Sequence, residues 1–85
     1  MLRRKNIQRE LIRLPAGEWS LREGSKEMAR FKIGDTVIMS TYNHPGVIRH
    51  TSIEAVKFME DDVIFLEDLF EKTIPLNMIE TIKVM

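Results

Sequence analysis

The stretch DVIFLEDLFEKTIPLNMIETIKV, which runs from Asp62 to Val84, decides the fold of this chain. It opens with a run of four apolar residues, 63–66, that has acidic residues on both sides. Four residues are too few for a helix and acidic flanks resist burial, so this run predicts a short buried strand. Pro75 holds the residue before it in extended backbone and cannot donate a hydrogen bond to a ladder. We therefore expect a second strand at residues 73–76 that lies at a sheet edge or ends there.

The end of the chain predicts one more turn and one more strand. Residues 77–80 have the length of a single 3₁₀ or α turn, which would carry the chain to another edge of the sheet. Ile82 and Val84 then alternate with Lys83, as expected for a strand with one buried face.

Residues 31–58 predict the strands that precede this stretch. Val37 and Met39 are two positions apart and would share one face of a strand. The sequence HPGV at 44–47 fits a type II turn, which favours proline at its second position and glycine at its third. The apolar residues of 47–58 change phase midway, which is typical of a barrel strand that bends or bulges. Four or five short strands separated by turns indicate a small, mainly β barrel.

The first 30 residues allow two structures. Asn6 could cap a helix over 7–14, whose apolar side chains recur at i, i+4 and i+7 and which a proline would end. Alternatively, residues 11–14 and 19–21 form two strands around the turn PAGE at 15–18, where proline and glycine supply the required backbone angles. The chain is thus expected to have an N-terminal arm, either a short helix or a hairpin, followed by the barrel at 31–85.

The length and composition narrow the class of protein. A chain of 85 residues has room for one domain and buries only about 60 to 65% of the surface that its unfolded form exposes. The absence of cysteine excludes disulfides and thiolate metal sites and favours a cytoplasmic location. No apolar run approaches the ~18 residues of a membrane span, and no secretory signal is visible, so we expect no membrane association.

A net charge of zero hides an uneven distribution of charge. Residues 1–32 hold nine Lys or Arg and four Asp or Glu, which gives +5, whereas 33–85 hold four and nine, which gives −5. Such a split suggests either an arm that contacts nucleic acid or an arm that folds back on its own domain or on a neighbour.

The body of the chain resembles the SH3-like small β-barrels, a broad group that includes KOW and Sm-type modules. The residues that carry the resemblance are FKIGDTV at 31–37 and, at the other end, IPL at 74–76 and MIETIKV at 78–84. The resemblance implies a non-catalytic binding module, because many such barrels serve transcription, translation or RNA handling and others bind peptides.

No catalytic constellation is recognisable in the sequence. The acidic run 60–62 lacks the alternating ligands and the glycine of a calcium loop, and we interpret it as a solvated hairpin turn. His44 and His50 have no cysteine or acidic partner at a spacing typical of a metal site. We therefore expect no enzyme, no metal and no cofactor.

Two kinds of partner remain. Aromatic and arginine side chains are enriched at the centres of protein interfaces, and the candidates of this kind are Trp19, Tyr42, His44, Arg49, His50 and Phe70. Trp19 has a second interpretation, in which it anchors the arm to the barrel. The favoured hypothesis is a non-enzymatic protein-interaction module, such as a small regulator or inhibitor, whose partner is another protein or a second copy in a homodimer.

The alternative hypothesis is a nucleic-acid-binding accessory protein that contacts RNA or DNA through its basic arm. Clustered cations displace phosphate counterions whatever the base sequence. The residues that would do so are Arg3, Arg4, Lys5, Arg9 and Arg13.

Overall fold

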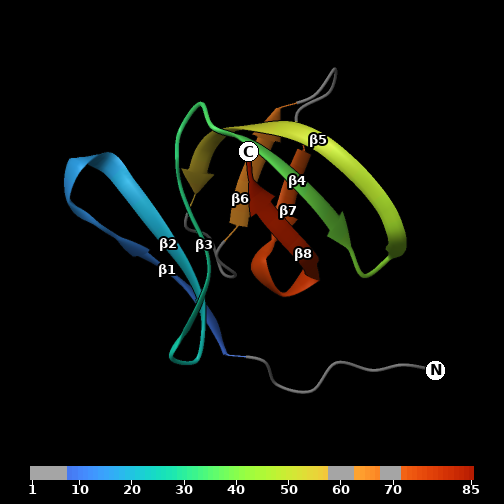
Figure 1. Cartoon of the computed structure of the whole chain (residues 1–85), viewed down its shortest axis with the longest axis horizontal. Helices are drawn as coiled ribbons and strands as arrows, with labels where there is room; N and C mark the ends of the chain where they lie inside the picture. The colour runs from blue at the N-terminus through green and yellow to red at the C-terminus, as the bar shows by residue number, and fades with distance from the viewer. Residues whose placement is uncertain (1–7, 58–62, 68–71) are drawn as a thin grey trace.

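The computed structural model describes residues 8–57, 63–67 and 72–85, and these residues form a mainly β protein. They hold eight strands and two 3₁₀ turns, with no α-helix among them, arranged in two antiparallel sheets (Figure 1). The prediction of a mainly β fold is confirmed. No helix in the described ranges has both the length and the apolar character needed to cross a lipid bilayer.

The first sheet is a meander of three strands with the order β1-β2-β3. Its elements are β1 (Arg9–Arg13), β2 (Glu18–Glu23) and β3 (Lys26–Lys32), and the 3₁₀ turn η1 (Pro15–Gly17) joins the first two. Of the two predictions for the arm, the hairpin is confirmed and the helix is wrong. Leu11 is buried between exposed neighbours and pairs with Leu21, so the apolar period here is two. The positive φ of Ala16 and Gly17 turns the chain back.

The second sheet has five strands in the order β7-β6-β5-β4-β8. Its elements are β4 (Thr36–Thr41), β5 (His44–Lys57), β6 (Val63–Glu67), β7 (Lys72–Pro75), the 3₁₀ turn η2 (Leu76–Met78) and β8 (Ile79–Val84). The strands predicted at 63–66 and 73–76 are confirmed, and Pro75 ends the edge strand β7. The predicted 3₁₀ turn is also present, one residue earlier than expected, since the residue after Pro75 already starts it.

Strand β5 links the two halves of this sheet. It is 14 residues long and arcs across the molecule, because its first half pairs with β4 and its second half with β6 (Figure 1). The predicted midway irregularity is confirmed by a register shift between Ile53 and Ala55. The turn predicted at 44–47 is misplaced: Thr41 pairs with His44, so the chain reverses at the two residues between them. Gly46, with φ of +81°, lies instead in an irregular part of β5.

Both sheets contribute to one core. Val37 and Met39 are fully buried and share a face, as predicted, and Phe31 of β3 is 1% exposed. The remaining buried apolar residues are Leu11, Leu21, Ala29, Ile53, Ile74, Leu76 and Ile79. Strand β3 runs through residues 30 and 31, where the arm was expected to end, and it lies against β8. The meander and the five-stranded sheet therefore pack as one unit.

Candidate functional site

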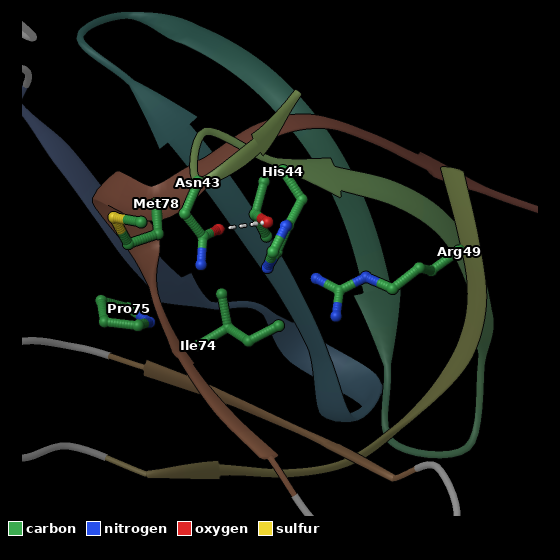
Figure 2. A pocket seen from close by; sticks show the side chains of 7 residues that line it. Asn43, His44, Arg49, Ile74, Pro75 and Met78 are labelled. Carbon is green, nitrogen blue, oxygen red and sulfur yellow. Dashed lines mark hydrogen bonds between the residues drawn. The ribbon is translucent and has the colours of Figure 1, made fainter. Parts of the chain in front are cut away.

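A cleft of about 290 Å³ lies at one end of the core, between the β4–β5 hairpin and the segment that joins β7 to β8 (Figure 2). The side chains that line it come from both walls: Thr41, Asn43, His44, Arg49, Ile74, Pro75 and Met78. Two of the predicted protein-binding residues, His44 and Arg49, are thus brought together with apolar residues some 30 positions away in the sequence.

Backbone and side-chain hydrogen bonds fix the tip of the hairpin. The Tyr42 N–H donates to the Met78 carbonyl oxygen at 2.9 Å, which holds the hairpin against η2. The Thr41 hydroxyl, itself buried, donates to Oδ1 of Asn43 at 2.6 Å. The turn is therefore attached to the opposite wall, and the oxygen of the Asn43 amide already accepts a hydrogen bond from within the protein.

An irregularity in β5 places His44 and Arg49 on the same cleft. Residues five positions apart in a regular strand point to opposite faces. Here Met39 pairs with Arg49 and Thr41 with His44. Ser40 of β4 therefore lies opposite four residues of β5, 45–48, so β5 has three extra residues between the two pairs. Arg49 thereby lies opposite the fully buried Met39, at the open end of the core. Figure 2 shows its guanidinium directed toward the His44 ring.

The lining divides into a polar rim and an apolar floor. Asn43 and His44 are exposed and Arg49 is half-buried, and all three carry N–H donors. Ile74 is buried and Met78 half-buried beneath them. No Asp or Glu is among the described side chains that line the cleft, so this described lining is positive or neutral.

Of the other predicted protein-binding residues, those that the structure describes do not line this cleft. His50 pairs with Ile38 and lies on the opposite face of β5 from Arg49. Tyr42 contributes its backbone to the turn and is half-buried. Phe70 lies outside the described residues.

Trp19 belongs to a second cleft, of about 380 Å³, and no described residue lines both this cleft and the first. It is half-buried and packs against the core, which supports its interpretation as an anchor. The Arg13 guanidinium carbon lies 5.7 Å from the centre of its ring, within the range of a cation–π contact. Ile33 and Val56 line the same cleft.

Arg9 is not available to nucleic acid in this structure, which corrects its prediction as a phosphate contact. Its side chain is 2% exposed. Its guanidinium donates to the carbonyl oxygens of Leu76 and Ile79, both at 2.6 Å, and to Glu23 at 3.2 Å. Arg9 therefore joins β1 to the η2–β8 segment.

Of the other predicted phosphate contacts, Arg13 is exposed and stacks on Trp19. Arg3, Arg4 and Lys5 lie outside the described residues.

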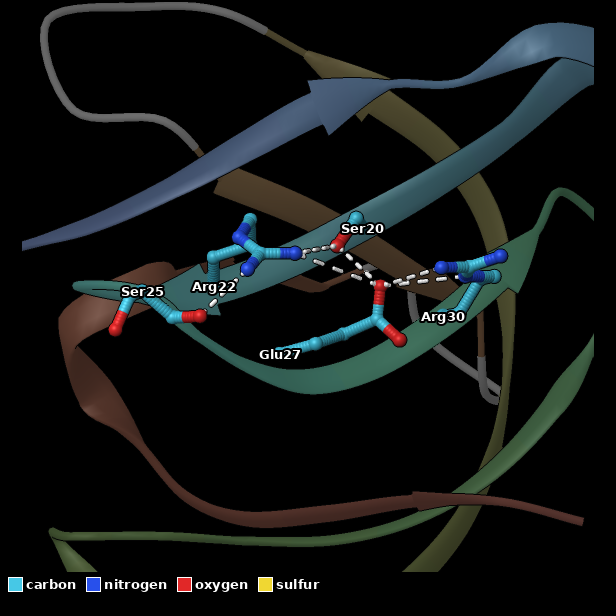
Figure 3. A network of polar contacts seen from close by, with 5 residues as sticks. All are labelled: Ser20, Arg22, Ser25, Glu27 and Arg30. Atoms are coloured by element: carbon cyan, nitrogen blue, oxygen red, sulfur yellow. Dashed lines mark hydrogen bonds and ion pairs between the residues drawn. The ribbon is translucent and has the colours of Figure 1, made fainter.

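A polar network on β2 and β3 engages two more arginines (Figure 3). The Ser20 hydroxyl donates to Oε2 of Glu27 at 2.6 Å, and Arg30 donates to the same oxygen at 3.1 and 3.2 Å. Arg22 lies 3.8 Å from it and also donates to the Ser25 carbonyl at 2.6 Å. The hydrogen bond from Ser20, and then that from Arg30, lower the pKa of Glu27. Much of the positive charge of the meander is thus balanced within the meander itself.

No cluster of three or more His, Asp or Glu side chains that could hold a metal ion occurs among the residues that the structure describes. Comparison with protein-family models, with curated proteins and with solved structures found no match.

Proposed function

We propose that this protein is a non-enzymatic protein-interaction module that receives a segment of its partner in the cleft between the β4–β5 hairpin and η2. The observation that carries the proposal is the lining of this cleft, in which Arg49 and His44 stand over an apolar floor. An arginine above apolar side chains is the combination that protein interfaces favour at their centres. The resemblance to SH3-like barrels supports the same proposal, because many of those are binding modules.

The distribution of charge favours a protein over a nucleic acid as the partner. Affinity for a phosphate backbone grows with the number of cations free to neutralise it. Among the described arginines, Arg9, Arg22 and Arg30 are each in an ion pair with a carboxylate of the meander. Of the described Lys and Arg side chains, Arg49 alone lines the cleft.

Site-specific crosslinking tests this proposal, and a chain without cysteine suits the method. Asn43→Cys, on the exposed turn at the cleft, is labelled with a photoreactive maleimide and irradiated in an extract of the source cells. Lys26→Cys, exposed at the start of β3, is the matched control. We expect protein adducts at position 43 that weaken when Arg49→Gln is added and are absent at position 26.

An adduct of twice the mass of the chain would identify a second copy as the protein partner. Equal yields at the two positions, or adducts that a nuclease removes, would contradict the proposal. The nuclease result would instead favour the RNA- or DNA-binding alternative.

A further inference from the structure

We infer that the cleft recognises a carboxylate, namely the side chain of an Asp or Glu in an extended segment of the partner, with an apolar neighbour seated on Ile74 and Met78. The inference rests on the proposed function and specifies the chemistry of the ligand at the same site. It follows from the donors on the rim, from the charge of Arg49 and from the size of the cleft.

The described side chains of the rim offer more hydrogen-bond donors than acceptors. The Arg49 guanidinium has five N–H donors and accepts none, and the His44 imidazole has an N–H in either protonation state. The acceptor of the Asn43 amide is taken by the Thr41 hydroxyl, which leaves its NH₂ group as the free end. Figure 2 shows this nitrogen on the side of the amide away from the dashed hydrogen bond, toward Ile74 and Pro75. A ligand that pairs with the donors of Arg49 and Asn43 must supply acceptors.

Arg49 differs from the other half-buried or buried arginines in its partners. Arg9 and Arg22 each lie within 4 Å of a carboxylate, at 3.2 and 3.8 Å. Arg49 has no such ion pair with any described residue, although its neighbours withdraw part of it from water. A planar carboxylate can accept two parallel hydrogen bonds from a guanidinium, which makes it one of the strong partners of an arginine.

The number of charges separates a carboxylate from a phosphate. Arg49 supplies one fixed positive charge, and no lysine or second arginine is among the lining side chains that the structure describes. One negative charge balances it, whereas a phosphate group carries about −1.5 to −2 at neutral pH. A volume of about 290 Å³ is at the lower end of ligand sites and suits one acidic side chain with an apolar neighbour.

Isothermal titration with defined peptides tests the inference. The probe is the pentapeptide Gly-Val-Glu-Val-Gly, acetylated at its N-terminus and amidated at its C-terminus. The comparison peptides replace its glutamate by glutamine, place the carboxylate at the C-terminus of the glutamine peptide, or replace the glutamate by phosphoserine. We expect the glutamate peptide to bind at least ~10-fold tighter than the glutamine peptide, since a hydrogen bond with a charged partner is worth that factor or more.

Variants of the protein assign the preference to the cleft. Arg49→Gln is expected to reduce the glutamate-to-glutamine ratio to about 2 or less, because its charge-assisted hydrogen bonds are lost. The matched controls Arg13→Gln, in the other cleft, and His50→Gln, on the other face of β5, should leave the ratio unchanged. Asn43→Leu, on an exposed turn, should lower the ratio about threefold, because an amide N–H donates more strongly to a carboxylate than to the neutral amide of glutamine. This variant keeps the test decisive if Arg49→Gln does not fold.

Equal binding of the glutamate and glutamine peptides would overturn the inference, as would tighter binding of the phosphoserine or the C-terminal carboxylate peptide. Failure of all four peptides to bind at ~5 mM would also overturn it, since Kd values weaker than this correspond to almost no net affinity. None of these results decides the proposed function, which the crosslinking at position 43 tests independently.

Discussion

Replacing Arg9 by methionine should destabilise the protein more than any other single change of a charged residue among those described. Methionine keeps an apolar stem of similar length but removes the guanidinium that donates to the Leu76 and Ile79 carbonyl oxygens at 2.6 Å. Hydrogen bonds from a charged donor contribute about 1.5 to 3 kcal/mol each, so two of them at the lower value give a loss of about 3 kcal/mol. The bond to Glu23 adds little, because that carboxylate is 42% exposed and screened by water.

This loss is large for a protein of 85 residues. The free energy of unfolding expected from size alone is about 4 to 13 kcal/mol, and a loss of 3 kcal/mol lowers the Tm by about 12 to 24 °C. Urea unfolding is followed by far-UV circular dichroism and by the fluorescence of Trp19, which is the only tryptophan of the chain.

The matched control for this experiment is Arg13→Met, at the other end of β1. Arg13 is exposed and makes a cation–π contact with Trp19, so its replacement should cost no more than about 1 kcal/mol. A loss of less than about 1 kcal/mol for Arg9→Met, or equal losses for the two variants, would refute the assignment of Arg9 as the residue that joins β1 to η2.

Three further changes test other parts of the fold. Glu27→Gln should destabilise the protein at neutral pH, where Ser20 and Arg30 bind the Glu27 carboxylate. The difference in unfolding free energy between the variant and the original protein should vanish as the pH falls below 4.5 and through the lowered pKa of Glu27, because the carboxylate is then protonated. A difference in urea midpoints that does not depend on pH would contradict this. Ala16→Gly should raise the free energy of unfolding by about 1 kcal/mol, because Ala16 has φ of +66° and this left-handed backbone costs residues other than glycine about that much. A fall in Tm would be the contrary result. Phe31→Ala, at a side chain that is 1% exposed, should cost about 3 to 5 kcal/mol, and a loss under 1 kcal/mol in chemical denaturation would remove Phe31 from the core.

The strands could be predicted from the sequence because their apolar residues alternate or run together between polar flanks. Val63–Glu67 and Lys72–Pro75 were recognisable in this way, and a proline marked the edge. The first 30 residues were ambiguous, since Leu11 and Leu14 suit the spacing of a helix as well as that of a hairpin. Pairing of Leu11 with Leu21 resolves this ambiguity, and only the folded chain shows it.

The cleft was only half predictable. Arg49 and His44 were identified by residue type, but their five-residue separation would place them on opposite faces of a regular strand. The register shift of β5 that brings them together leaves no apolar signature, because Val47 and Ile48 within it are 54% and 56% exposed. The floor residue Ile74 was predicted as part of a strand, with no sign of what it would face.

The burial of Arg9 could not be predicted either. An arginine in a basic run is usually solvated, and the two carbonyl groups that bind it lie 67 and 70 positions away in the chain. A local pattern contains no information about such partners. The same holds for Ser20, which is 1% exposed and reaches Glu27 across the β2–β3 ladder.

The most direct test of the central claim is to observe the donors of the cleft while a carboxylate binds. In ¹⁵N-resolved NMR, the side-chain Nε–Hε signal of Arg49 and the side-chain NH₂ signals of Asn43 are followed during titration with the glutamate peptide. If the cleft binds a carboxylate, these signals shift together and saturate with one Kd, while the Nε–Hε signal of Arg13 stays in place. Signals of Arg49 and Asn43 that do not move while the peptide binds, or equal shifts at Arg13 and Arg49, would contradict it.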